Sequence, residues 1–231
     1  MNSKYLLLLF TFLFVTHWAG AQDATTLMNR IRANLEKIND YEADAKFKTE
    51  ISFLKVPDAV VKIYYKKPDK IKIKNQNGIS LVPRGTASIS LYSLVNGHYT
   101  TLDGGTDLIQ GVPVHIIKLL PSDENADLVL ATLYIDSKRM IVLKAITTTR
   151  ENGTDEVELF YGKFLPLGLP DRIVFSFSTQ EFKLPKGVTF DYDDGSAKNK
   201  ETGPRKNQRG KIEITYLDYN INKGLSDILF K

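Results

Sequence analysis

The chain has 231 residues, of which 42% are hydrophobic and 25% charged, a balance that excludes wholesale disorder and fibrous repeats. Its formal charge of +4, from 31 Lys and Arg against 27 Asp and Glu, is too small for a general nucleic-acid footprint, so no nucleic-acid partner is expected. Cysteine is absent, which excludes disulfides, thiol nucleophiles, iron–sulfur clusters and a lipid-attachment cysteine.

Residues 1–21 carry the pattern of a secretory signal peptide. Lys4 precedes an apolar run from Tyr5 to Val15, and Ala19-Gly20-Ala21 forms a small-x-small cleavage site. The run is shorter than the ~20 residues that span a bilayer, although an uncleaved anchor is the alternative. We therefore expect cleavage after Ala21, export, and one folded domain over residues 22–231.

The next segment has the period of an amphipathic helix. Apolar residues recur at spacings of three and four from Leu27 to Ile38, with polar residues between them. This pattern predicts a helix from about Ala24 to Ile38. Asp23 is expected to cap its start, and Asn39-Asp40 to end it.

From Tyr41 onward the period changes to two, which is typical of strands. Asn-Gly pairs and Asp136-Ser137-Lys138 supply turns between the apolar runs. About ten short strands are expected, which makes the predicted fold mainly β, a single curved or barrel-like antiparallel sheet. The later predicted strands are Ile89–Leu94, His98–Leu102, Val114–Leu120, Leu128–Ile135, Met140–Thr149, Glu156–Tyr161, Arg172–Phe177 and Lys211–Tyr219. A second helix is possible only in Ser80–Ser88 or Gly104–Gly111.

Many strands alternate apolar residues on one face with charged or polar residues on the other. A single helix of about 15 residues, ~22 Å long, cannot cover the apolar face of such a sheet. Either the barrel closes and its own side chains fill it, or the sheet lines a cavity for an apolar ligand. Strand parity predicts the cavity lining to include Phe47, Ile63, Tyr65, Ile73, Leu143, Leu159, Phe175 and Phe177.

Catalytic patterns are missing from the sequence. His98 and His115 have no Ser or carboxylate at motif spacing, and no nucleophile elbow, zinc-protease or phosphate-loop motif occurs. The acidic run Asp191–Asp194 is similar to a calcium loop, but Gly195 and Thr202 do not fit the EF-hand positions. No enzyme activity, cofactor or metal is therefore expected.

Basic residues gather in Lys62–Lys74 and Lys198–Lys211. Solvated surfaces explain both runs most simply, and attraction to an anionic membrane or an acidic partner is the alternative. Lys67 stands out, because the alternation along Val61, Ile63 and Tyr65 points it to the apolar side unless Pro68 resets the register.

Two segments resemble the LolA-type outer-membrane lipoprotein carriers. The stretch Ile63–Ile71 (IYYKKPDKI) is similar to the family's apolar strand that ends in a basic, Pro-containing turn. The stretch Phe182–Asp191 (FKLPKGVTFD) is similar to the family's F-x-P-P-x-G-V-x-V-D run. The C-terminal stretch from Tyr216 looks like the tail of the broader lipoprotein-sorting relatives. The order of signal peptide, helix and strands also matches, so the resemblance covers nearly all of residues 22–231.

The resemblance implies an unclosed β-barrel, with an N-terminal amphipathic helix and other lid elements over an apolar cavity. It also implies a periplasmic carrier that binds the acyl chains of lipoproteins, or lipid, and moves them toward the outer membrane. Its partners would be an inner-membrane donor complex and an outer-membrane acceptor, and a monomer is expected. A periplasmic sensor or scaffold of the same fold, which binds lipid or a regulatory protein, is the alternative.

The resemblance places Lys67 where the carriers keep a basic latch residue, an Arg. Lys67 is therefore predicted to hold the lid closed in the ligand-free state, through backbone carbonyls at the end of a lid helix or in a loop. An ammonium on a long stem lacks the planar fork of Arg, so the latch should be looser.

Overall fold

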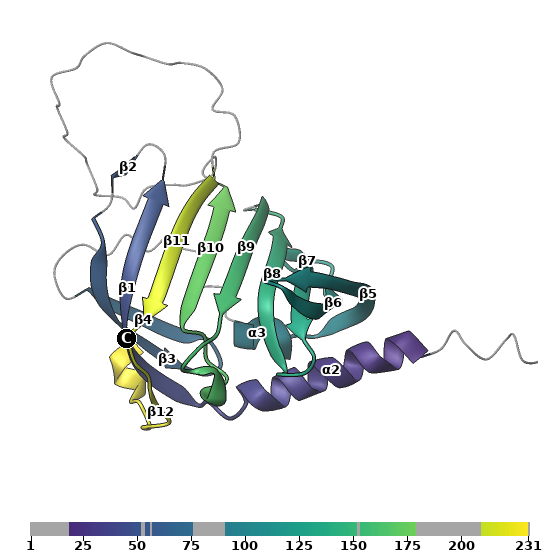
Figure 1. Ribbon diagram of the computed structural model, residues 1–231, viewed down its shortest axis with the longest axis horizontal. Coiled ribbons are helices and arrows are strands. Elements are labelled where there is room, and N and C mark those ends of the chain that lie inside the picture. The colour runs from purple at the N-terminus through teal and green to yellow at the C-terminus, as the bar shows by residue number, and fades with distance from the viewer. Residues whose placement is uncertain are drawn as a thin grey trace, which may run out of the picture.

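In the computed structural model, one large antiparallel sheet dominates the part of the chain that the structure describes, which is residues 19–51, 54–55, 57–75, 91–151, 153–178 and 209–230. Ten strands lie side by side in the order β4-β3-β1-β11-β10-β9-β8-β7-β6-β5, and the short β2 and β12 pair with β1. Figure 1 shows how the sheet curves away from a long helix at its lower edge.

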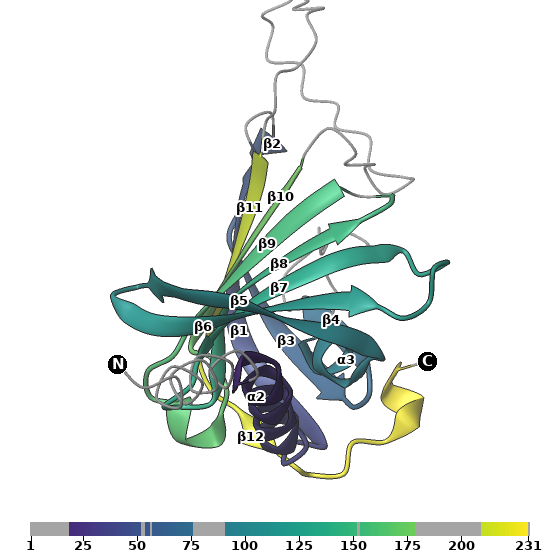
Figure 2. The same cartoon turned by 90° about the vertical axis from the view of Figure 1, so that its right-hand side faces the viewer.

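The strands are bounded as follows: β1 Asp40–Ile51, β2 Leu54–Lys55, β3 Ala59–Lys66, β4 Lys70–Asn75, β5 Tyr99–Ile109, β6 Val112–Pro121, β7 Leu128–Asp136, β8 Ile141–Thr149, β9 Gly153–Phe160, β10 Arg172–Ser178, β11 Arg209–Tyr216 and β12 Asn220–Ile221. β4 and β5 form the two edges and, among the described residues, do not pair with each other. The sheet is therefore curved but not closed into a barrel, which confirms the predicted fold class. Figure 2 shows the strands fanning out as their direction turns across the sheet.

Strand register separates an apolar face from a charged face. In the β1–β3 pair, Ala43 faces Ile63 and Ala45 faces Val61, and all four are buried. The alternate positions point the other way. There Lys62 Nζ lies 2.6 Å from a carboxylate oxygen of Glu42. The period of two in the sequence thus produces one face for the core and one for solvent.

Two α-helices pack against part of the apolar face. Helix α2 (Ala19–Leu35) buries Leu27, Met28 and Ile31, and helix α3 (Leu91–Asn96) buries Leu94 and Val95, all in one core cluster with residues of β6 to β9. The Arg32 guanidinium donates a hydrogen bond to the Val95 carbonyl oxygen at 3.0 Å, which joins the two helices. No helix in the described ranges is long and apolar enough to cross a membrane.

The structure corrects the predicted helices. Helix α2 starts before Ala24 and ends three residues before Ile38, so Asp23 lies inside it instead of capping it. The predicted strand Ile89–Leu94 is largely helix α3. A six-residue segment with four apolar residues and two serines fits a strand or a buried helical turn equally well, which is why periodicity failed there.

A second correction concerns β5, which continues far beyond the predicted end at Leu102. The register between β5 and β6 shifts between Asp103 and Thr106, and Gly105 in this bulge has φ +83°. Glycine adopts this left-handed backbone without strain. The Gly-Gly pair is therefore a bulge within a strand, so the predicted connection Gly104–Gly111 contains no helix.

The chain after β11 forms what we call the C-terminal strap, residues 217–230, which includes β12 and the short 3-10 helix η2 (Asp227–Phe230). Asn222, in the left-handed region at φ +56°, accepts a hydrogen bond from Asn39 N and donates one to the Lys37 carbonyl oxygen. Buried Asp40 accepts from the backbone N–H groups of Lys223 and Gly224. The strap thus fastens the junction between α2 and β1.

Several predicted features lie outside the described residues. They are residues 1–18 of the predicted signal peptide, the possible helix Ser80–Ser88, the motif Phe182–Asp191, the acidic run Asp191–Asp194 and most of the basic run Lys198–Lys211.

Candidate functional site: an apolar cavity under two helices

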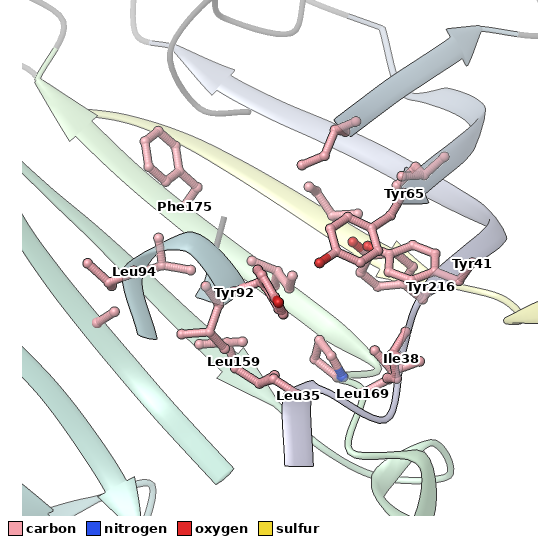
Figure 3. Close-up of a pocket in the computed structure, with 18 of the residues that line it drawn as sticks. Leu35, Ile38, Tyr41, Tyr65, Tyr92, Leu94, Leu159, Leu169, Phe175 and Tyr216 are labelled. Atoms are coloured by element: carbon pink, nitrogen blue, oxygen red, sulfur yellow. The ribbon is translucent and has the colours of Figure 1, made fainter. Parts of the chain in front are cut away.

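A cavity of about 250 Å³ lies between the apolar face of the sheet and the ends of the two helices. Strands β1, β3 and β4 line one side, strands β8 to β11 line the other, and the loop around Leu169 contributes from below (Figure 3). Leu35 enters from the end of α2, Ile38 from the turn after it, and Tyr92 and Leu94 from α3. The helices therefore form one wall of the cavity as well as part of the core.

The lining is almost entirely uncharged. Aliphatic and aromatic side chains make most of it, and Asp155 on β9 is the one charged residue among the described lining residues. Six tyrosines contribute to the wall: Tyr41, Tyr65, Tyr92, Tyr161, Tyr216 and Tyr219. Such a surface suits an apolar ligand with few polar groups.

Six of the eight residues predicted from strand parity line this cavity, namely Phe47, Ile63, Tyr65, Ile73, Leu159 and Phe175. They come from five different strands, and the curvature of the sheet brings them together. Their contact with a ligand remains a prediction.

Leu143 does not line the cavity. The register between β7 and β8 pairs Tyr134 with Lys144 but Ile135 with Val142, so Leu143 is the extra residue of a bulge. It is buried in a separate cluster with Val114 and Ile141. A bulge breaks the alternation of faces along a strand. The prediction from strand parity that Leu143 faces the cavity was therefore wrong.

Phe177 is also absent from the cavity wall, although it shares a face of β10 with Phe175. Its ring lies over Gly210, where an added Cβ would come within 2.5 Å of it, and it stacks on Phe175 at 5.4 Å between centroids. Phe177 is thus part of the core behind Phe175. Parity predicts the face of a strand but not how far along it a cavity extends.

The predicted lining missed the α3 residues and five of the six tyrosines, Tyr92 of α3 among them. Tyr41 alternates with Ala43, Ala45 and Phe47, so parity was a signal that could have found it. Tyr92 on α3 carried no such signal, because its segment was taken for a strand. Its place in the wall depends on where α3 packs.

Four tyrosines form an aromatic cluster at one end of the cavity. Tyr41 stacks on Tyr65 at 5.0 Å and Tyr216 on Tyr219 at 4.7 Å, and Tyr41 meets Tyr219 edge to face. Figure 3 shows Tyr41, Tyr65 and Tyr216 together on one side, away from Leu94 and Leu159. Removal from water raises the pKa of Tyr216 to about 12 and that of Tyr41 well above its usual value. These hydroxyls therefore stay protonated near neutral pH.

Lys67 lies at the rim of the cavity wall, where β3 ends. Its ammonium donates to the Glu36 carbonyl oxygen at 3.2 Å and to a Glu36 carboxylate oxygen at 2.8 Å. Glu36 directly follows the last residue of α2, so the contact joins β3 to the end of this helix. The structure therefore contains a backbone-carbonyl contact at the helix end, one of the two places that the sequence argument left open, while its action as a latch remains a prediction.

Glu36 also contacts the second helix. The Tyr92 hydroxyl on α3 donates to the other carboxylate oxygen of Glu36. Hydrogen bonds from Lys67 and Tyr92 lower the pKa of Glu36, because both stabilise its charged form. The same bond to Glu36 raises the pKa of Tyr92. Glu36 thus connects β3, α2 and α3 at one point, which we call the rim contact (Glu36, Lys67 and Tyr92).

The described residues contain no group of three or more His, Cys, Asp or Glu side chains that could hold a metal ion. His115 on β6 lies 3.0 Å from Asp103 on β5, outside the cavity.

No protein-family model and no curated protein matches this sequence. In fold, the chain is similar to a putative outer membrane lipoprotein-sorting protein domain from Vibrio parahaemolyticus, with TM-score 0.58, 10% identity, and 91% of this chain and 97% of that chain covered. A LolA superfamily protein from Nitrosomonas europaea gives TM-score 0.56 and 10% identity over 90% of this chain and 97% of that chain. A DUF1329 family protein from Desulfovibrio piger gives TM-score 0.57 and 12% identity, with 92% of this chain and 97% of that chain covered.

At these identities the likeness shows the fold alone. The fold is that of the LolA-type proteins, as the sequence resemblance led us to expect.

Proposed function

We propose that this protein is a periplasmic carrier that binds the acyl chains of lipoproteins, or of related lipids, and moves them toward the outer membrane. The observation that supports this most is the apolar cavity under α2 and α3, whose wall contains a single charged residue among those described. Burial of each CH₂ group is worth about 0.8 kcal/mol, so a long chain supplies ample binding energy without catalytic or metal chemistry.

The size of the cavity suggests that the lid helices move when ligand enters. Ligand pockets usually measure about 300–1,000 Å³, and the cavity of about 250 Å³ is slightly smaller. Leu35, Ile38 and Tyr92 form the wall that gives way, because they belong to α2, to the turn after it and to α3, and not to the sheet. The rim contact joins these ends to the end of β3, which supports our proposal that Lys67 acts as a latch.

Export and transfer complete the proposal. The signal-peptide pattern in residues 1–21, with cleavage after Ala21, supports a periplasmic location. The donor complex in the inner membrane, the acceptor in the outer membrane and a monomeric state follow from the resemblance alone.

Native mass spectrometry of the protein from a diderm host tests the proposal directly. We expect copurified lipid or lipopeptide, and we expect the Phe175→Glu variant to lose it, because a carboxylate in the cavity wall opposes acyl binding. Ser176→Glu is the matched control, since the next residue of β10 points to the other face. A copurified protein in place of lipid would favour the sensor or scaffold alternative. Absence of any acyl ligand, together with no binding of added acyl probes, would refute the carrier.

A further inference from the structure

Strands β3 and β4 present lysines on the face opposite the cavity. Ile63 and Ile73 form a cross-strand pair that lines the cavity, so the alternate positions of both strands point outward. At those positions the register places Lys62, Lys66, Lys70, Lys72 and Lys74. The outer face of this edge of the sheet is therefore basic.

The two strands do not balance this charge themselves. Residues 59–75, which span β3, β4 and the turn between them, contain six lysines, one acidic residue and no arginine. Carboxylates of other segments hold two of the lysines, since Lys62 pairs with Glu42 and Lys67 with Glu36. The positive charge of the outer face thus lies mainly toward the edge strand β4.

The C-terminal strap brings an apolar side chain to the same place. Asp227 of η2 pairs with Lys66 at 2.8 Å and with Lys70 at 3.1 Å, and Lys66 donates to the Leu225 carbonyl oxygen at 2.7 Å. These contacts hold the C-terminal helical turn beside β4 (Figure 1). The next residue, Ile228, is 75% exposed, more than any other large hydrophobic residue in the described ranges. An apolar side chain therefore stands in water directly beside the lysines.

Each of these features alone has a simple explanation, but their combination is typical of a membrane-facing surface. Lysines on an edge strand discourage pairing with other strands, and single exposed apolar residues are normal. Together, ammonium groups attract lipid phosphates while an apolar side chain enters the headgroup layer. Lysine is a mobile point charge that suits a fluid layer of headgroups, whereas the planar fork of arginine suits the fixed carboxylates of a protein partner.

The opposite end of the sheet carries the opposite charge. Residues 99–160, which contain β5 to β9, hold ten acidic residues and five Lys or Arg. β5 is the far edge of the sheet from β4. An anionic surface attracts one end of the molecule and repels the other, so the charge distribution favours a single orientation with β3 and β4 toward that surface.

We propose that Lys66, Lys70, Lys74 and Ile228 form a docking surface for an anionic phospholipid bilayer. The ammonium groups contact lipid phosphates, and Ile228 enters the headgroup layer. This goes beyond the proposed function, because it concerns the outer face of the sheet and not the cavity. Lys66 directly precedes Lys67 of the rim contact, so docking brings the end of α2 toward the bilayer.

Vesicle binding by the intact protein, purified from the periplasm of a diderm host, tests this proposal. Sedimentation compares vesicles of phosphatidylcholine alone with vesicles that also contain phosphatidylglycerol. One lysine near an anionic bilayer improves partitioning about fivefold, so three lysines less the charge of Asp227 should favour the anionic vesicles about 25-fold. High salt should remove this preference, because it screens the charges.

A charge-reversal pair separates the docking surface from the net charge of the protein. Lys74 is exposed on β4 and lies over the Tyr64 ring, 5.4 Å from its centroid. Lys74→Glu should weaken binding to the anionic vesicles about 25-fold, because an attractive charge becomes a repulsive one. Lys118→Glu is the matched control, since Lys118 is exposed on β6 in the acidic half. It changes the net charge equally and should have little effect.

A second pair tests the apolar part of the surface. Ile228→Ser should weaken binding to the anionic vesicles about fivefold, because the apolar side chain no longer enters the headgroup layer. Leu108→Ser is the matched control, since Leu108 is 66% exposed but lies on the far edge strand β5. Circular dichroism establishes that each variant is folded.

The outcomes are distinct. A preference for anionic vesicles that depends on Lys74 and Ile228, and not on Lys118 and Leu108, supports the proposal. Equal binding to both kinds of vesicle overturns it and leaves an acidic protein as the partner of these lysines. Equal losses within either matched pair also overturn it, because binding then does not belong to this surface. The carrier proposal is unaffected by these results, since acyl binding is measured separately.

Discussion

The two halves of the sheet bury their apolar faces in different ways. In the half that contains β6 and β7, side chains such as Ile117, Leu133 and Ile135 are 0% exposed, because they share one core cluster with α2 and α3. Strands β8 and β9 lie between the halves and contribute both to this cluster and to the cavity wall. In the other half, Ile73, Phe175 and others on β4, β10 and β11 are only partly buried and line the cavity. The same alternation of residues therefore yields a packed core under the helices and a binding surface beside them.

Helix length explains the difference. Helix α2 has 17 residues, which corresponds to about 25 Å, and α3 adds six residues. Together they reach across only part of the ten strands, so the cavity lies where the helices end. We therefore expect the covered half to contribute most to the stability of the fold, and the cavity half to contribute most to ligand binding.

The largest expected effect is a loss of stability in the covered half. Leu133→Ala should lower the free energy of unfolding by about 2–5 kcal/mol, because it leaves a void in a fully buried cluster. Ile73→Ala, in the cavity half, should cost clearly less, since its side chain is only partly buried. Urea denaturation measures both. Equal losses would contradict the division between the two halves.

A smaller loss is expected at the junction that connects the halves. Asn222→Ala should cost about 1–2 kcal/mol, because two hydrogen bonds to Lys37 and Asn39 disappear and the left-handed backbone disfavours Ala. Hydrogen exchange should speed up at residues 36–40 and much less in β7. Asn222→Gly keeps the backbone geometry and removes only the side-chain hydrogen bonds. Its free energy of unfolding should therefore lie between those of the wild type and of Asn222→Ala. Unchanged exchange at residues 36–40 would show that the strap does not hold this junction.

The rim contact should affect release of ligand more than stability. Lys67 is 25% exposed and Glu36 44% exposed, so water weakens their ion pair. Lys67→Leu should bind acyl probes as well as wild type or better, yet transfer them to acceptor membranes about 2- to 10-fold more slowly. Lys67→Arg should be tolerated. Normal transfer by Lys67→Leu would leave this lysine a strand-end residue without a latch role.

The smallest expected effect is a dependence on pH. Lys67 and Tyr92 lower the pKa of Glu36 below its ordinary 4.5. Their stabilisation of the closed lid is therefore fully present above that pH. It is lost as the pH falls through the still lower pKa of the folded protein. Closure of the lid should thus be constant around neutral pH and weaken only in acid. Transfer assays across pH, with Glu36→Gln as a variant that lacks this titration, measure it. A change centred near neutral pH would point to another group.

Local patterns predicted much of the fold but failed at specific places. The period of two placed Phe47, Ile63, Tyr65 and Ile73 on the face that carries the cavity, because each lies in a regular strand. It failed at Leu143, where a bulge shifts the register. It also failed in the segment before Asn96, where a short apolar run is a helix.

The amino-acid sequence by itself determined the class of the fold, the amphipathic helix and the apolar face of a single sheet, since these depend on periodicity within one segment. Tertiary structure decided where the cavity lies, because its extent depends on how far α2 and α3 reach over the sheet. It also decided the partners of Lys67. Lys67 and Tyr92 lie 31 and 56 residues from Glu36 in the sequence. No local pattern therefore predicts that these three side chains are in contact.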